Sequence, residues 1–294
     1  MKRVLITGAN SFVGTNIEKW LLKDPENFQV DTVDTMNDVW KMADFTKYDS
    51  VFHVAGIAHV DPKPEMAPLY YKVNRDLAIE VAKHAKECGV KQFIYMSSRI
   101  VYRASKTLKG NVTTPDTQPE PNDFYGDSKL QAEKGLHELE SPTFKVAILR
   151  PPMIYGSNSK GNFLRLGWLA TKTPVFPAWH NKRSMLYIDN LAEFVKQIII
   201  HEMGGTFFPQ NKELADTVEI VRYFAHKYHK KIWISRIFNP FVWLGSKFLK
   251  PLPKMFSDSY YVPEMSKYDF EYQLVSLKES LNGIEITDAN KRMK

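Results

Sequence analysis

Tyr125 and Lys129 are four residues apart, a spacing that could let the two side chains share one chemical task. In a segment expected to be helical, this spacing places both side chains on the same face. An ammonium group beside a phenol favours the phenolate, so the pair predicts a tyrosine pKa lowered from about 10 toward neutrality. Such a phenolate can take the proton of a substrate hydroxyl. The alternative is a Tyr/Lys pair on a solvated helix face, since the pattern alone is common.

A second pattern, near the N-terminus, is suited to binding a dinucleotide. An apolar segment runs directly into Thr-Gly-Ala-Asn-Ser-Phe-Val-Gly, which is followed by a helical pattern. Gly8 allows a tight turn, Gly14 allows the helix to pack closely on the strand, and N–H groups at the helix start can face a pyrophosphate. A Gly/Asn turn without a ligand is the alternative. The predicted cofactor contacts in this loop are Gly8, Asn10, Ser11, Phe12, Val13 and Gly14.

Asp34 stands about 20 residues beyond the last glycine of this loop, at the end of a second predicted strand. An acid at this position accepts hydrogen bonds from the adenine-ribose hydroxyls, and its charge repels a ribose 2′-phosphate. The pattern therefore predicts NAD rather than NADP as the cofactor. Asp31 is the competing candidate, although its offset of three positions should place it on the opposite face of the strand.

Strands and helices must alternate to position these residues, and the first half of the chain shows that alternation. It predicts an α/β fold with a doubly wound, mostly parallel sheet and right-handed crossovers. We expect strands at residues 4–7, 28–34, 50–55, 92–97 and 145–149, helices at 12–22, 73–88 and 124–139, and a functional loop at 106–122.

Together these patterns resemble the extended short-chain dehydrogenase/reductases of the NAD-dependent epimerase/dehydratase family, over about residues 1–195. The family's usual loop has a glycine where this chain has Ser11. A side chain is tolerable there if φ stays negative, and its hydroxyl could still donate to phosphate. The segment Met-Ser-Ser-Arg-Ile-Val-Tyr resembles the family's strand end that carries a catalytic serine. The resemblance implies that Ser98 bridges the substrate oxygen and Tyr125, with Ser97 as the alternative.

The resemblance also implies which residues lie beside the dinucleotide. Ala55 and Gly56 match small residues beneath it, whereas His53 in the same segment is expected to be packed rather than catalytic. Asp44 and Phe45 match a short segment beside adenine, with a helix or turn cap as the alternative for Asp44. The resemblance thus adds Asp44, Phe45, Ala55, Gly56 and Lys129 to the expected cofactor contacts.

For the substrate, the resemblance implies two contacts with a nucleotide diphosphate. Asn162 matches an asparagine that touches the diphosphate, and Arg183 matches an arginine that forks onto it. A surface salt bridge is the alternative for Arg183. The expected substrate contacts are Ser98, Arg99, Tyr125, Asn162 and Arg183.

Arg99 and Ile100 follow Ser98 at the positions where the family's 4,6-dehydratases carry Asp and Glu, which argues against a dehydratase. We therefore expect an NAD-dependent 4-epimerase of a UDP-hexose or UDP-N-acetylhexosamine, for surface-polysaccharide or cell-envelope sugar biosynthesis. A 4-keto reductase of a deoxy-sugar nucleotide is one alternative, and a non-catalytic NAD-sensing protein on the same fold is the other. The family also implies a homodimer.

Repeated prolines interrupt the second half of the chain, which predicts a smaller and loop-rich region. We expect a Rossmann domain over residues 1–160, to which residues 184–202 return. Residues 161–294 should mainly form a substrate-binding domain interleaved with it.

The bulk composition adds little to this choice. The net charge of +7 comes from scattered basic residues, so we expect no nucleic-acid partner, and no metal site is expected. No apolar segment approaches the roughly 20 residues that span a bilayer, and the apolar run at the N-terminus is short, so we expect a cytoplasmic protein. Residues 233–256 mix aromatic and aliphatic residues with lysines. Contact with a membrane surface and a lipid-diphosphate carrier therefore stay open, beside a helix that covers the active site.

Overall fold

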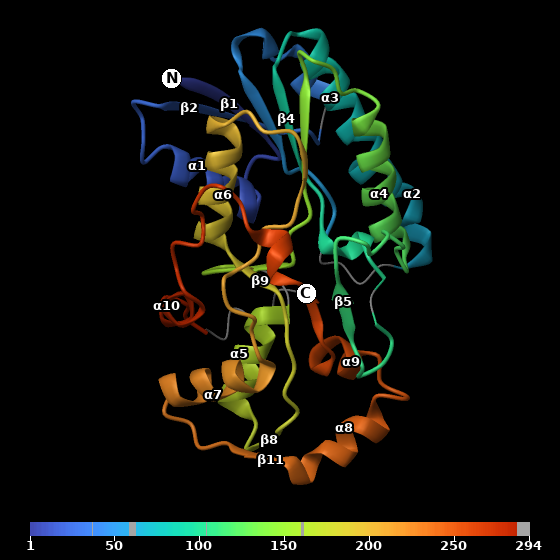
Figure 1. The fold of residues 1–294 in the computed structure, drawn as a ribbon, viewed down its shortest axis with the longest axis vertical. Helices are drawn as coiled ribbons and strands as arrows, with labels where there is room; N and C mark the ends of the chain where they lie inside the picture. Colours follow the sequence, from blue (N-terminus) through green and yellow to red (C-terminus); the bar gives the residue numbers. More distant parts are fainter. Residues whose placement is uncertain (37, 59–62, 104, 160–161, 287–294) are drawn as a thin grey trace.

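The structure of the chain is a computed structural model that describes residues 1–36, 38–58, 63–103, 105–159 and 162–286. Its centre is a six-stranded parallel sheet with the strand order β10-β6-β4-β3-β1-β2 (Figure 1). The chain turns outward from β1 to β2 and then crosses to β3 on the other side, so the order reverses beside β1. The predicted doubly wound α/β fold is confirmed. The strands are β1 Lys2–Thr7, β2 Phe28–Val33, β3 Ser50–His53, β4 Gln92–Met96, β6 Lys145–Leu149 and β10 Gly205–Phe207.

Helices cover both faces of the sheet, which explains why its strands are apolar on both sides. In β1, Val4 and Ile6 belong to one core, and Leu5 belongs to the core on the opposite face. Helices α1 and α6 pack over the first face, and α3 and α4 pack over the second (Figure 1). These helices are α1 Phe12–Leu21, α3 Leu77–Glu87, α4 Phe124–His137 and α6 Ile188–Ile200.

Two predicted elements differ from the observed ones. The helix expected at 73–88 is preceded by α2 (Ala67–Tyr70) and starts as a π-helical turn over Tyr71–Asp76, where Tyr95 Oη donates to the carbonyl of Asn74 at 2.8 Å. The loop expected at 106–122 contains the short strand β5 (Asn111–Thr113). Its partner, β12 (Ser259–Tyr261), lies far along the chain, so no local pattern could reveal the pairing.

The second half of the chain packs below the sheet in Figure 1 around its own apolar core. Residues 188–207 return to the sheet as α6 and β10. The division into two domains near residue 160 stays a prediction. Within the described ranges, none of the helices has the length and apolar character to cross a lipid bilayer. The remaining elements are β7 Met153–Tyr155, α5 Asn162–Lys172, β8 Val175–Pro177, β9 Met185–Tyr187, α7 Thr217–Lys227, β11 Trp233–Ser235, α8 Asn239–Gly245, α9 Pro251–Phe256 and α10 Leu277–Asn282.

Candidate active site

The cofactor loop joins β1 to α1 at the carboxyl edge of the sheet. Gly8 has a φ of +95°, and a Cβ there would lie 2.8 Å from the backbone N of Ala55. At Gly14, a Cβ would approach the side chain of Ser11 to 2.7 Å. Both glycines therefore stand where a side chain would collide, as the pattern indicated. The turn leads directly into the start of α1, and N–H groups at a helix start are suited to binding a pyrophosphate.

Ser11 has a φ of −74° and forms the N-cap of α1. The negative φ is the condition under which we expected a side chain to be tolerated. Its Oγ accepts a hydrogen bond from Gly14 N at 3.0 Å, which occupies one of the helix N–H groups. The hydroxyl can still donate its own hydrogen, so Ser11 can offer phosphate a side-chain donor in exchange. Asn10 adopts a left-handed φ of 63°, and Phe12 and Val13 pack against the core beneath α1.

Asp34 follows β2 directly and lies beside the cofactor loop, because Gly8 N donates to the carbonyl of Val33 at 3.0 Å. Its side chain is exposed. Asp31, by contrast, is half-buried and accepts a hydrogen bond from Tyr48 Oη at 2.9 Å. The geometry therefore favours Asp34 as the ribose contact and gives Asp31 a structural role.

Asp44 and Phe45, the two residues expected beside adenine, have different roles in the structure. Asp44 caps the short 3-10 helix that begins at Phe45, and it accepts a hydrogen bond from Thr46 N at 3.1 Å. The structure thus shows the capping role that was the alternative for Asp44. Phe45 is fully buried against Trp40 and His84, so only its backbone could reach a ligand.

Ala55 and Gly56 continue from β3 beneath the cofactor loop. A Cβ on Gly56 would lie 3.0 Å from Asn74 Oδ1 and 3.2 Å from Lys129 Nζ, so the glycine brings the backbone close to the predicted catalytic lysine. Asn74 is fully buried and accepts a hydrogen bond from Ile57 N at 2.8 Å, which holds this segment in place. Asn74 was not among the predicted site residues, although a polar residue inside an apolar helical pattern could have indicated it.

His53 is packed rather than exposed to a ligand, as expected. It is fully buried, shares a 2.7 Å hydrogen bond with Thr7 Oγ1, and stacks on the ring of Phe93. Burial, together with the charge of Lys129, lowers the pKa of His53 to about 3. The imidazole is therefore neutral at ordinary pH.

Tyr125 lies in the first turn of α4, where it meets the end of β4. The N-cap Asp123 accepts a hydrogen bond from Gly126 N at 2.9 Å. A Cβ on Gly126 would lie 2.6 Å from the carbonyl O of Ile100, so the helix start is pressed against the segment after β4. This approach brings the hydroxyl of Ser98 close enough to Tyr125 to lower the pKa of the phenol. Ser98 Oγ also accepts from Ile100 N at 3.2 Å, which orients the hydroxyl.

The pKa of Tyr125 differs from the expected one. Burial raises this pKa to about 12, and the hydrogen bond with Ser98 offsets the rise only in part. The Nζ of Lys129 donates to the carbonyl of Met96 at 2.9 Å and lies 4.7 Å from the ring centre of Tyr95. The prediction that Lys129 brings the pKa of Tyr125 toward neutrality is therefore wrong for this structure, and Tyr125 is protonated at neutral pH.

Glu133, one turn beyond Lys129 on α4, is a buried residue that the sequence analysis missed. Its carboxylate accepts from Arg150 Nη2 at 2.6 Å and from Ser97 Oγ. Burial lowers the pKa of Lys129 to about 8, although the charge of Glu133 opposes that shift. These contacts give Ser97 a structural role and favour Ser98 as the catalytic serine. The sequence signal for Glu133 was its spacing, because it lies four residues after Lys129 on the same helix face.

The two predicted substrate arginines flank β12. Arg99 Nη1 donates to Ser259 Oγ at 2.7 Å and Nη2 donates to Thr113 Oγ1 at 3.0 Å, while its buried Nε has no hydrogen-bond partner within the described ranges. Arg183 forms a backbone bridge with Ser259, and its Nη1 donates to the carbonyl of Lys254 at 2.7 Å. Both guanidinium groups are thus held by neutral partners.

Arg99 and Arg183 have no carboxylate within ion-pair distance among the residues that the structure describes. The surface salt bridge that was the alternative for Arg183 is therefore not seen there. Burial lowers the pKa of Arg99, and burial together with the charge of Arg99 lowers the pKa of Arg183 to about 10. Two neighbouring, half-buried cations create a setting in which a bound anion is favourable.

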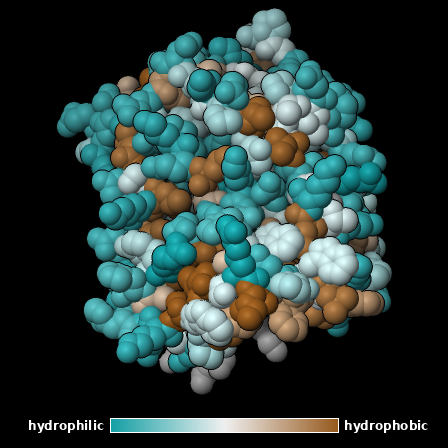
Figure 2. Space-filling model, turned by 60° about the horizontal axis from the view of Figure 1, so that its bottom comes forward, coloured by the Kyte–Doolittle hydropathy of each residue, from teal (hydrophilic) through white to brown (hydrophobic). Residues whose placement is uncertain are grey.

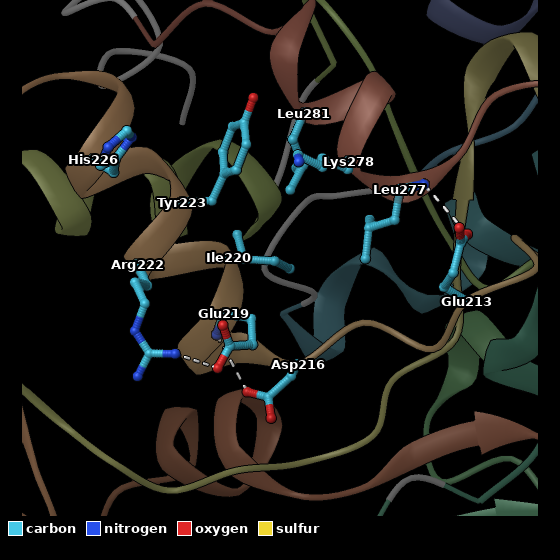
Figure 3. A pocket seen from close by; sticks show the side chains of 10 residues that line it. All are labelled: Glu213, Asp216, Glu219, Ile220, Arg222, Tyr223, His226, Leu277, Lys278 and Leu281. Atoms are coloured by element: carbon cyan, nitrogen blue, oxygen red, sulfur yellow. Dashed lines mark hydrogen bonds and ion pairs between the residues drawn. The ribbon is translucent and has the colours of Figure 1, made fainter.

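Asn162 is the first residue of α5, and its side chain lies outside the described part of the structure. An open hollow of about 590 Å³ lies between α7 and α10 (Figure 3). Its polar groups already serve the local structure, since Asp216 caps α7 and Glu219 pairs with Arg222. None of the predicted site residues lines this hollow, so it is not the candidate active site.

Comparisons with known proteins identify the family and the fold. The model of the family described as "NAD dependent epimerase/dehydratase family" matches residues 4–207. UDP-glucose 4-epimerase of Vibrio cholerae is 32% identical over 79% of this chain and 77% of its own length. N-acetyl-alpha-D-glucosaminyl-diphospho-ditrans,octacis-undecaprenol 4-epimerase of Escherichia coli O157:H7 is 28% identical over 69% of this chain and 64% of its own length. The structure of UDP-glucuronic acid 4-epimerase from Bacillus cereus in complex with NAD shares the fold, with a TM-score of 0.75, 20% identity and 99% of both chains covered.

Proposed function

The chain belongs to the NAD dependent epimerase/dehydratase family, and on that premise we propose that it is an NAD-dependent 4-epimerase of a UDP-hexose or UDP-N-acetylhexosamine. The convergence of Ser98 at the end of β4 with Tyr125 on α4, one helical turn from Lys129, carries the proposal. The likeness to UDP-glucose 4-epimerase of Vibrio cholerae supports both the reaction and the nucleotide. The product sugar would serve surface-polysaccharide or cell-envelope biosynthesis.

The site residues divide the proton chemistry between them. When bound, NAD supplies the acceptor and later the donor of the hydride exchanged with C4 of the sugar. Tyr125 exchanges a proton with the C4 hydroxyl, and Ser98 hydrogen-bonds to the same oxygen. With a pKa of about 12, Tyr125 is in the protonated form that reduction of a keto sugar needs. We assign to Lys129, one turn away and close to Gly56, contact with the bound cofactor.

The diphosphate of the substrate is assigned to the side of the site that contains Arg99 and Arg183. Neither arginine has a carboxylate within ion-pair distance among the described residues. A guanidinium can bind phosphate oxygens through two N–H groups at once. A lipid diphosphate is a second candidate carrier, because one relative is named as the 4-epimerase of an undecaprenol-diphosphate sugar. The cytoplasmic location and the homodimer stay predictions.

Two other functions remain as alternatives that the same test can distinguish. A 4-keto reductase would use the same Ser98, Tyr125 and Lys129, so the geometry of these three residues serves both reactions. A non-catalytic NAD-sensing protein would not need Ser98 and Tyr125 side by side near Lys129, and their proximity favours an enzyme.

The decisive experiment is NMR of candidate substrates incubated with the protein and NAD but without added reductant. The panel contains UDP-hexoses, UDP-N-acetylhexosamines and an undecaprenyl-diphosphate N-acetylhexosamine, with the Tyr125→Phe variant as the control. An epimerase regenerates its cofactor in every cycle, so we expect one sugar to convert to its C4 epimer with wild-type protein only. If none converts but a 4-keto sugar nucleotide oxidises added NADH, the reductase replaces the epimerase. If neither reaction occurs while NAD binds, the sensor interpretation is correct.

A further inference from the structure

A cluster of large apolar side chains is exposed at the end of the molecule opposite the sheet. The cluster lies on β11, the 3-10 helix Arg236–Phe238, α8 and the turn that follows α8, near the bottom of Figure 1. Figure 2, which brings that bottom forward, shows apolar side chains gathered among hydrophilic ones. We call this cluster the α8 surface. It consists of Trp233 at 59% exposure, Ile237 at 62%, Phe241 at 71%, Trp243 at 54%, Leu244 at 53%, Phe248 at 78% and Leu249 at 56%.

The α8 surface is exposed because its helices are short and are anchored through few residues. Within α8 only Val242 is buried, and within α9 Pro253 and Phe256 are buried. A Cβ on Gly245 would lie 2.7 Å from Leu252 Cδ1, so the two helices are closely packed at their turn. The segment is therefore a fixed part of the fold, yet most of its apolar side chains have no protein contact that removes them from water. Exposed apolar clusters of this kind mark binding surfaces.

The chain segment that contains the α8 surface has charged residues of one sign. Residues 220–257 contain eight lysine or arginine residues and no aspartate or glutamate. Arg236, Lys247 and Lys250 are exposed, and no carboxylate of the described chain lies within ion-pair distance of them. Lys247 Nζ lies 3.9 Å from the ring centre of Trp243, so positive charge and aromatic surface are in direct contact. A partner must therefore offer both negative charge and an apolar interior.

We propose that the α8 surface binds the face of an anionic lipid bilayer. Tryptophan, phenylalanine and leucine can enter the boundary between headgroups and acyl chains, while lysine and arginine extend to the anionic headgroups. A protein partner fits less well, because lysine is depleted from the cores of protein interfaces. A nucleic acid offers charge but little apolar surface to cover Phe241, Phe248 and Leu249.

The position of the α8 surface gives the binding a possible consequence for the site. The carbonyls of Lys254 and Met255, at the end of α9, accept hydrogen bonds from Arg183. A docked α8 surface would thus place the bilayer next to the helix that holds the predicted diphosphate-binding arginine. This consequence rests on the proposed function, whereas the binding to lipid does not.

Co-sedimentation of the full-length protein with vesicles tests the proposal without using turnover. One set of vesicles contains phosphatidylcholine alone, and the other contains phosphatidylcholine with phosphatidylglycerol. The apolar variant is Phe241→Asp with Phe248→Asp, and the charge variant is Lys247→Glu with Lys250→Glu. Their matched controls carry the same changes at exposed residues of the sheet half: Val39→Asp with Met42→Asp, and Lys19→Glu with Lys145→Glu.

We expect wild type and both controls to sediment with anionic vesicles and to be released by salt, since charge attraction to the surface is screened. Each α8 variant should bind at least about tenfold more weakly, because each basic residue near an anionic surface contributes roughly fivefold to binding. Circular dichroism and NAD binding check that the variants are folded. The proposal is overturned if wild type does not prefer anionic vesicles, or if the α8 variants bind as wild type does. A change of oligomeric state in the α8 variants, measured by sedimentation velocity, would instead make this surface a contact between copies.

Discussion

Two sides of the candidate site differ in whether their arginine side chains are paired with a carboxylate. On the α4 side, Arg150 meets Glu133 at 2.6 Å, and this contact raises the pKa of Arg150 although burial alone would lower it. On the β12 side, Arg99 and Arg183 have only neutral partners among the described residues, and burial lowers the pKa of both. We call these the paired side and the unpaired side.

The difference indicates which charges serve the fold and which serve a ligand. A buried ion pair is internally compensated, and removing one partner leaves the other charge without a solvating group. A buried cation without a counter-charge is already less favourable in the protein alone, so an arriving anion stabilises it. Variants on the paired side should therefore lower stability, whereas variants on the unpaired side should lower affinity for substrate.

The largest effect is expected at Tyr125, whose hydroxyl lies where chemistry should occur. Tyr125→Phe removes one hydroxyl from α4 and should leave folding nearly unchanged. General acid–base catalysis typically contributes 10²–10⁴-fold, so turnover should fall by about that factor. Steady-state kinetics on the substrate found by NMR, with thermal unfolding alongside, measures both. Turnover near that of wild type would exclude Tyr125 as the acid–base group.

The paired side is tested by Glu133→Ala. Loss of one partner from a buried pair should lower the free energy of unfolding by about 3–5 kcal/mol. The control is Glu138→Ala, an exposed change at the C-cap of the same helix that should shift stability by less than about 0.5 kcal/mol. The double variant Glu133→Leu with Arg150→Met should recover much of the loss in urea unfolding. Equal stability of the Glu133→Ala and Glu138→Ala variants would contradict the assignment of a paired side.

The unpaired side is tested by Arg183→Ala. One lost charge-assisted contact should cost about 1.5–3 kcal/mol of substrate affinity, which is roughly a 10- to 150-fold rise in KM. The loss of stability should be smaller than for Glu133→Ala, and affinity for NAD should change little. Kinetics and NAD titration on the same preparation separate these effects. An unchanged KM would place the diphosphate elsewhere.

Lys129 is an intermediate case. Burial lowers its pKa and the charge of Glu133 raises it, but the two side chains do not form an ion pair. Its pKa is about 8 in the folded protein and about 10.5 when unfolded, so between these values the unfolded state binds more protons. Stability contributed by this group therefore rises with pH, by about 1.5 kcal/mol from pH 8 to pH 9.5. Urea unfolding at both pH values should show this rise in wild type relative to Lys129→Met. The same pH response in both proteins would mean that Lys129 titrates normally.

The smallest effect is expected at Asp34, which is exposed and outside both sides. Its charge should favour NAD over NADP, and Asp34→Asn should reduce that preference by roughly five- to tenfold because only the repulsion of a 2′-phosphate is removed. Asp31→Asn is the matched control, since Asp31 is engaged by Tyr48. Fluorescence titration with both dinucleotides measures the ratio. A wild-type preference for NADP would remove the role of Asp34.

The sequence predicted the parts of the site that depend on local spacing. The positions of Gly8 and Gly14 around a helix start, and of Tyr125 and Lys129 on one helix face, follow from chain geometry over a few residues. The alternation of strands and helices likewise indicated a mostly parallel sheet, because parallel strands require crossover connections. The family's description as NAD dependent agrees with the predicted cofactor.

Only the tertiary structure decided the contacts between segments that are distant in the sequence. It distinguishes Ser97 from Ser98, because the hydroxyl of Ser97 contacts Glu133 and that of Ser98 lies near Tyr125. It also raised the pKa of Tyr125 where local spacing had indicated a lower one, since burial is set by everything packed around α4. Whether a cation such as Arg183 is paired depends on which neighbours the whole fold supplies, so a list of charges along the chain does not determine it.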